Sequence, residues 1–421
     1  MSFLFPFLNF LQPGILWPES ADLRPMLVAS AVALIVGLLR KSDFKRSEAW
    51  SHPVFVWLMI FMILQVISVY YGGIYSMFEE LTYWYIYPMF VVISVLLLSN
   101  VKSMTRYVLG MIVGGMVVVV YGIYSVPAWG GYIGSGRAGA YGMYENHNDY
   151  TFIIVQIMPF IFMYARTTKN TALQVLLAVC FLLCGIGIFM SLSRGGVLAL
   201  ALQLLLIALI GMDGKRRFLF VPFIVVAAIG AIGYQWAMRA ENQSNYTAED
   251  AEAGRLELWK TGLIMALKHP LLGTGSRRFS EYAHEYYDLS HDMRGKVSHN
   301  TYVEVLAGSG FSGLGAFLAM FYFLARGLHR AATSNNSPWL DAMRRATLIG
   351  LYTVLFRDML DAKPHDWSLY VFCALGLACI LLHRRLNSET GPGQREPLPA
   401  TAQSVRVRLT SANAAMNRPS G

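Results

Sequence analysis

Residues 298–313 read SHNTYVEVLAGSGFSG, and within this stretch the chain changes from a polar turn to an apolar helix. The change places an ionisable side chain, His299, at the mouth of a predicted membrane span. A group that can carry charge is costly at that depth and is usually found there because it has a function. His299 is therefore the first candidate functional residue of the chain.

The composition predicts an integral membrane protein. Of the 421 residues, 55% are hydrophobic and only 14% are charged, and the mean hydropathy is +0.45. A soluble domain of this size needs more polar surface. The net charge is +9, and the basic residues that produce it lie between the apolar runs. This placement favours anionic lipid headgroups over nucleic acid as a partner. The four cysteines lie inside apolar runs and predict neither a disulfide nor a metal site.

Apolar runs that are long enough to cross or nearly cross a bilayer predict the architecture. We expect an all-α membrane protein of about twelve transmembrane helices, with nine over residues 1–236 and three over 301–386. Residues 237–300 form one long loop, and residues 387–421 a disordered tail. The predicted spans are residues 3–17, 25–39, 53–71, 83–99, 107–126, 150–165, 172–191, 196–212, 217–236, 301–326, 344–360 and 366–383.

Basic residues predict the orientation, because short cytoplasmic loops carry an excess of Lys and Arg. With both termini inside, the basic residues gather in every short inner loop, whereas the outer loop 72–82 carries Glu79 and Glu80 instead. Arg137 and Arg194 are exceptions on the outer side, so we expect them to serve something other than insertion.

The long loop is also predicted to be outside, and it contains a helix. Its apolar side chains recur at helical spacing, which predicts a helix that lies on the membrane surface and ends at His269-Pro270. The apolar positions are Leu256, Trp259, Leu263 and Leu267.

Three outer motifs contain candidate functional residues. In SRGG, residues 193–196, an Arg at a helix N-terminus can present its guanidinium group and backbone N–H groups to an anion, although Arg194 could instead reach a lipid phosphate. Arg255 begins the surface helix and alone would be a solvated charge, but a diphosphate needs more than one cation. His299-Asn300 is either a site or a polar helix cap. Glu304, about one turn below, either orients His299 or makes a buried polar contact.

The ordered set of motifs resembles the O-antigen ligase and polymerase family over about residues 130–325. The resemblance is carried by SRGG (193–196), GRLELW (254–259), HPLLGTG (269–275) and His299-Asn300 with Gly310 after nine further residues. The segment from GRAG (136–139) to NHN (146–148) also resembles a family element, in which the role of His147 is open.

The resemblance implies a GT-C-like glycosyltransferase of the bacterial inner membrane with its active site facing the periplasm. Such an enzyme transfers an oligosaccharide from undecaprenyl diphosphate to an acceptor hydroxyl, with inversion and without a metal ion or other cofactor. His299 would be the general base, and Arg194 and Arg255 would hold the diphosphate. The implied substrate-binding residues are Arg137, Asn300, Tyr302 and Glu304.

Three acceptors are compatible with the resemblance: the lipid A core of a ligase, a second lipid-linked glycan of a polymerase, or a protein hydroxyl. The moderate length of the outer loop favours the ligase, because no large extra domain is present to receive a protein. A polytopic transporter is a further alternative, but its charges would lie at mid-membrane. This chain keeps its charges at the ends of the spans, with Arg357 and Asp358 as the main exception.

The predicted topology can be tested with single cysteines and an impermeant thiol reagent in intact cells. Reagent applied outside should label positions near Tyr132, Tyr246 and Glu285, and should miss positions near Lys102 and Lys215. Labelling at the last two would exclude the twelve-span arrangement.

Overall fold

The computed structural model describes residues 1–16, 24–70, 73–131, 134, 136–212, 214, 230, 233, 248–331, 337–362 and 364–389. All regular elements in these ranges are helices, which confirms the predicted all-α class. The longer helices are α1 (Leu4–Leu11), α3 (Pro25–Leu39), α5 (Pro53–Ile67), α6 (Gly73–Trp84), α7 (Ile86–Leu97), α8 (Val101–Trp129), α9 (His147–Thr167), α10 (Thr171–Met190), α11 (Arg194–Leu206), α13 (Ala248–Lys268), α14 (Phe279–Tyr286), α15 (Thr301–Arg330), α16 (Pro338–Arg357) and α17 (Trp367–Glu389). The short elements are α2 (Pro13–Leu16), α4 (Arg46–Trp50), a π-helical turn (Ile207–Gly211) and two 3₁₀ turns (Gly142–Tyr144 and His291–Met293).

Several of these helices match the predicted spans. Within the described residues, 7 helical segments are long and apolar enough to cross a membrane, and 3 shorter apolar helices accompany them. The chain is thus a multi-pass membrane protein. The predicted span 217–236 lies outside the described residues apart from two isolated positions, so the count of twelve stays a prediction. The last helix, α17, continues past residue 386 to Glu389, and the rest of the predicted tail lies outside the described residues.

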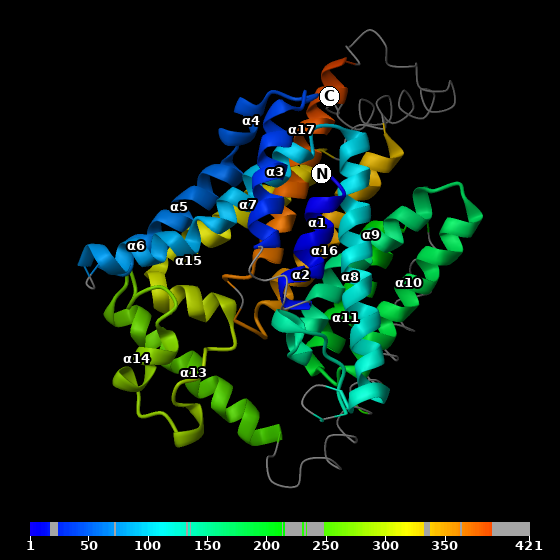
Figure 1. The fold of residues 1–421 in the computed structure, drawn as a ribbon. Coiled ribbons are helices and arrows are strands. Elements are labelled where there is room, and N and C mark those ends of the chain that lie inside the picture. The colour runs from blue at the N-terminus through cyan, green and yellow to red at the C-terminus, as the bar shows by residue number, and fades with distance from the viewer. Residues whose placement is uncertain are drawn as a thin grey trace, which may run out of the picture.

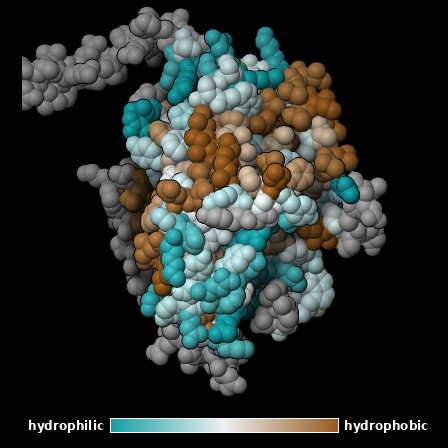
Figure 2. Space-filling model, turned by 90° about the vertical axis from the view of Figure 1, so that its left-hand side faces the viewer, coloured by the Kyte–Doolittle hydropathy of each residue, from teal (hydrophilic) through white to brown (hydrophobic). Residues whose placement is uncertain are grey.

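The helices form one bundle with α13 and α14 at one end (Figure 1). We call the end with α13 and α14 the α13 end. The C-terminal end of α17 lies at the opposite end of the bundle. Within the bundle α9 packs against α16, α15 against α5, and α1 against α8. Figure 2 shows hydrophobic residues gathered in a band between two more hydrophilic ends. This distribution is the one expected of a surface that meets lipid tails.

The predicted outer loop 72–82 is instead mostly helical, as α6 (Gly73–Trp84). One carboxylate oxygen of Glu80 accepts a hydrogen bond of 3.0 Å from Nε1 of Trp84, one turn later. The other accepts from Nη2 of Arg277 at 2.9 Å, and that guanidinium group stacks 3.7 Å from the ring centre of Tyr83. Glu80 is only 4% exposed. The ion pair with Arg277, which is distant in the sequence, compensates the burial of its carboxylate and so allows Glu80 to be part of this helix.

The helix α15 is broken at Gly310, whose φ of 67° and ψ of −169° lie outside the helical region. At the break, backbone groups of α15 lose their partners within the helix and form hydrogen bonds with the turn 270–275 instead. Ala307 and Gly308 accept hydrogen bonds through their carbonyl oxygens from the N–H groups of Thr274 at 2.9 Å and Gly275 at 3.0 Å. The N–H of Phe311 donates to the carbonyl of Pro270 at 2.8 Å. The HPLLGTG motif is therefore a turn bound to the break in α15.

Gly310→Ala is expected to destabilise the protein, whereas Gly315→Ala on the same helix is not. A Cβ at position 310 would lie 2.6 Å from backbone atoms of Leu271, in a backbone conformation that costs a non-glycine residue about 1–3 kcal/mol. A Cβ at Gly315 meets nothing within 4 Å. Thermal unfolding of both purified variants in detergent measures the difference. Equal melting temperatures would contradict the assigned role of Gly310.

Candidate functional site

His299 lies in a turn that its neighbours hold closed from both sides. Its φ of 51° is in the left-handed region, and the following residue, Asn300, is the N-cap of α15. The side-chain oxygen of Asn300 accepts hydrogen bonds from the N–H groups of Tyr302 at 3.0 Å and Val303 at 3.2 Å. Ser298 and Asn300 are buried, whereas the His299 side chain keeps 35% of its surface exposed. The turn therefore presents an imidazole on a fixed backbone.

Glu304 and Tyr302 brace this turn and the helix that follows it. A carboxylate oxygen of Glu304 accepts a 3.0 Å hydrogen bond from the N–H of Ser298. Of the two roles considered for Glu304, the structure shows the buried polar contact, made to the residue before His299. The Tyr302 hydroxyl donates to the carbonyl of Leu355 in α16 at 2.7 Å. Binding of substrate by Asn300, Tyr302 and Glu304 stays a prediction.

Behind His299 lies an acidic residue that the sequence analysis did not select. Oδ1 of Asp361 is 4.0 Å from Nδ1 of His299, and Oδ2 is 3.6 Å from Nη2 of Arg357. The loop that carries Asp361 is tied to the start of α15, because the N–H and the hydroxyl of Thr301 both donate to the Asp361 carbonyl, at 2.9 and 2.8 Å. The i,i+4 spacing of Arg357 and Asp361 was the one local signal for this pair.

Asp358 adjoins the same loop. Its carbonyl accepts a 2.8 Å hydrogen bond from the N–H of Thr301. Its side chain is fully buried. Asp361 is the residue whose carboxylate contact with the His299 ring the structure shows.

Arg357 joins His299 to the other predicted motifs. It is 1% exposed, and its Nη2 donates to the carbonyl of Asn148 at 3.2 Å. Its guanidinium group also lies against the start of α11, where a Cβ on Gly195 would be 3.5 Å from it. The sequence marked Arg357 only as a charge that interrupts an apolar run. In the fold, Arg357 connects the segment 146–148, the SRGG turn and the His299 turn.

The SRGG turn is fixed by Ser193 and by Arg137, a residue that the resemblance implies as substrate-binding. Ser193 caps α11, since its hydroxyl accepts from the N–H of Gly196 at 3.2 Å and donates to the side chain of Asn148 at 2.7 Å. Arg137 donates through Nε to the carbonyl of Ser191 at 3.0 Å and through Nη2 to that of Leu192 at 3.1 Å. These bonds hold the turn from which the half-buried Arg194 starts α11. Whether Arg137 also binds substrate stays a prediction.

The predicted surface helix is α13, which ends at Lys268 directly before His269-Pro270. Three of its four predicted apolar positions are exposed, with Leu256 at 62%, Leu263 at 49% and Leu267 at 64%. Trp259 instead donates through Nε1 to the carbonyl of Ser298 at 3.1 Å. The half-buried Arg255 lies one turn before Trp259, on a helix that contacts the His299 turn directly.

His147 is the first residue of α9 and is half-buried. The residue before it, Asn146, caps α9 by accepting a 2.8 Å hydrogen bond from the N–H of Asn148. In the described ranges no three His, Cys, Asp or Glu side chains come together as a metal site would require. The chemical groups that the fold does bring together are the partly exposed imidazole of His299, the carboxylate of Asp361 and the guanidinium group of Arg357.

The comparison with known families bears on this arrangement. Residues 178–318 match the family model described as O-antigen ligase. The match supports the O-antigen ligase and polymerase family for this chain. It covers Arg194, Arg255 and His299, whereas Arg137, Arg357 and Asp361 lie outside the matched residues. No curated protein matches the chain. The family consists of glycosyltransferase-like enzymes of O-antigen and glycan assembly, whose substrates are in general lipid-linked glycans.

Proposed function

We propose that this protein is an O-antigen ligase-like enzyme of the bacterial inner membrane. It transfers a glycan from undecaprenyl diphosphate to a hydroxyl of the lipid A core on the periplasmic face, with inversion and without a metal ion. The family match and the membrane helices support the class. The observation that carries the mechanism is the partly exposed His299 in a braced turn, with Asp361 behind its Nδ1 atom.

In the proposed reaction the acceptor hydroxyl oxygen forms a bond to the anomeric carbon while the bond from that carbon to the diphosphate breaks. The hydroxyl proton moves to the imidazole of His299, and undecaprenyl diphosphate leaves with the bonding electron pair. Asp361 would orient the ring and stabilise the imidazolium that forms. Arg357, buried behind Asp361, holds that carboxylate in position. At 4.0 Å the His299–Asp361 contact is longer than a hydrogen bond, as such pairs often are before substrate binds.

Arg194 and Arg255 are proposed to hold the diphosphate. A lipid diphosphate already leaves readily, so the protein has to bind its charge and orient it, which guanidinium groups do in a bidentate manner. Arg194 is the first residue of α11, where the helix dipole also favours an anion. Arg255 lies on the helix that contacts the His299 turn through Trp259.

Substitution by Lys separates diphosphate binding from turn positioning. Arg194→Lys and Arg255→Lys keep the charge but lose the fork, and each should lower transfer about tenfold with an unchanged melting temperature. Arg137→Lys should lower both, because the hydrogen bonds to Ser191 and Leu192 are lost. Transfer from purified lipid-linked donor and thermal unfolding give the two readouts. Wild-type transfer by the Ala variants of Arg194 and Arg255 would exclude their role.

The base assignment is tested by His299→Asn and His299→Gln. Both residues supply hydrogen bonds but neither titrates near neutrality, so transfer should fall by about 10² to 10⁴ while insertion is retained. Asp361→Asn should lower the rate less and leave the KM for donor unchanged, because Asp361 acts through His299. A near wild-type rate in His299→Gln would leave His299 a structural residue only.

A further inference from the structure

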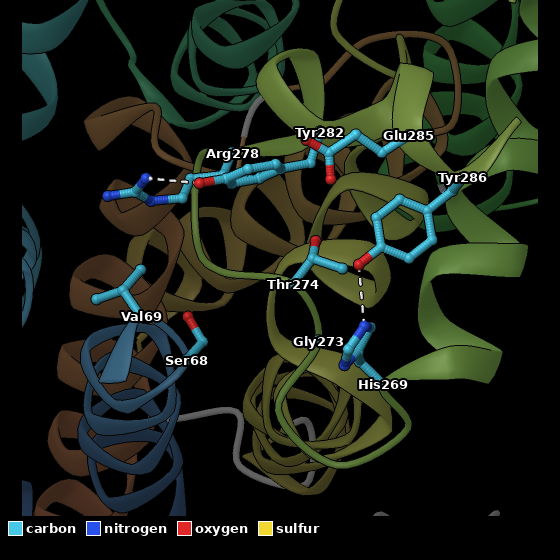
Figure 3. Close-up of a pocket in the computed structure, with 9 residues that line it drawn as sticks. All are labelled: Ser68, Val69, His269, Gly273, Thr274, Arg278, Tyr282, Glu285 and Tyr286. Atoms are coloured by element: carbon cyan, nitrogen blue, oxygen red, sulfur yellow. Dashed lines mark hydrogen bonds between the residues drawn. The ribbon is translucent and has the colours of Figure 1, made fainter. Parts of the chain in front are cut away.

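A pocket lined by aromatic and polar side chains lies at the α13 end, between α14, the turn 270–275 and the end of α5 (Figure 3). Its volume is about 280 Å³, near the lower limit for ligand pockets. Neither His299 nor Arg194 nor Arg255 lines it. The proposed transfer reaction therefore leaves the pocket without a role.

One wall of the pocket is formed by α14. Phe279 and Ala283, each 1% exposed, pack against the core formed with α13 and α15. Tyr282 and Tyr286 also pack against this core, and together with Glu285 they line the pocket (Figure 3). This spacing of three and four residues places them side by side on one helix surface.

The floor of the pocket is rigid. It includes Gly273 and Thr274, and the N–H of Thr274 donates to the carbonyl of Ala307 beside the break in α15. The hydroxyl of Ser68, at the end of α5, accepts a 2.8 Å hydrogen bond from the N–H of Ser276. The pocket is thus lined by three separate parts of the chain, and hydrogen bonds join its floor to α5 and α15.

The chemistry of the lining suits a neutral polyhydroxyl ligand. Tyr282 and Tyr286 offer aromatic surface, and their hydroxyls contact Nη1 of Arg278 at 3.4 Å and Nε2 of His269 at 2.9 Å (Figure 3). Arg278 and Glu285 bring opposite charges, and Arg278 is already paired with Glu281 at 3.4 Å. Lys268 lies 5.1 Å from the ring centre of Tyr286, so the two cations Lys268 and Arg278 are balanced by the carboxylates of Glu281 and Glu285. An anion would therefore find no excess of positive charge here. Hydrogen-bond donors and acceptors beside aromatic surface match the hydroxyls and the apolar face of a sugar ring.

We propose that this pocket binds a saccharide unit of the donor glycan at a distance from the transferred bond. The inference rests on the proposed function for its substrate. The helix α13 sets the spacing, because Trp259 contacts the His299 turn and His269 follows the last residue of the same helix. Ten residues of helix separate the two positions and span about 15 Å at 1.5 Å per residue. The pocket thus selects glycans that are long enough to reach it from His299.

The test is direct binding by the full-length protein in lipid nanodiscs, measured by titration calorimetry. The probe is the lipid-free glycan that mild acid releases from the donor used for transfer. Tyr282→Ala should weaken binding about tenfold, whereas Tyr282→Phe, which keeps the ring, should bind within about twofold of wild type. Tyr75→Ala is the matched control, because Tyr75 is an 80% exposed tyrosine of α6 outside the pocket. Inorganic pyrophosphate should not displace the glycan.

Binding and catalysis fail separately in this design. His299→Gln should bind the free glycan like wild type even though transfer is lost, and Tyr282→Ala should raise the KM for donor with little change in kcat. Wild-type binding by a folded Tyr282→Ala variant, displacement by pyrophosphate, or no binding by wild type would each overturn the pocket assignment and leave the transfer mechanism standing. Glycan binding without transfer by wild type would instead reject the proposed function and retain the pocket.

Discussion

Inside a bilayer every backbone N–H and carbonyl needs a partner from the protein, and α15 breaks this pairing at Gly310. The turn 270–275 supplies the missing partners, at Ala307, Gly308 and Phe311. This exchange fixes the extramembrane segment to the bundle by its own backbone. It also sets where α13 and α14 lie, and hence the position of Trp259 beneath the His299 turn. The segment from α13 to the His299 turn is therefore part of the helical fold, not an appendage to it.

A second constraint is electrostatic. A buried guanidinium group is costly unless several acceptors share it, and Arg357 contacts the Asn148 carbonyl and the Asp361 carboxylate while it packs on Gly195. These contacts belong to three segments that are far apart in the sequence. Two of these segments carry residues with proposed roles: Arg194, beside Gly195, in anion binding, and Asp361 in orienting the His299 ring. A single buried side chain thus keeps the parts of the site in register.

The sequence predicts the features that follow from the spacing of apolar residues, such as the position of the helices. It does not predict features that depend on a residue far away in the sequence. Apolar runs located the helices near the predicted spans, and the recurrence of Leu256, Leu263 and Leu267 predicted α13. The sequence predicts a loop where α6 lies, because the partner that stabilises Glu80 in this helix, Arg277, comes almost two hundred residues later. Asp361 was missed for the same reason, since its relation to His299 exists only after α15 and α16 pack. The His299 motif itself was found because its residues are contiguous.

The left-handed backbone at His299 has a consequence for which amino acids this position can accept during evolution. Apart from glycine, the residues that adopt such a conformation most readily are Asn, Asp and His. Of these only His exchanges a proton near neutral pH when its pKa is unperturbed. Backbone geometry and acid–base chemistry therefore restrict the residue at this position independently, and histidine satisfies both restrictions. A β-branched replacement such as Val would be penalised by the turn before any chemistry was affected.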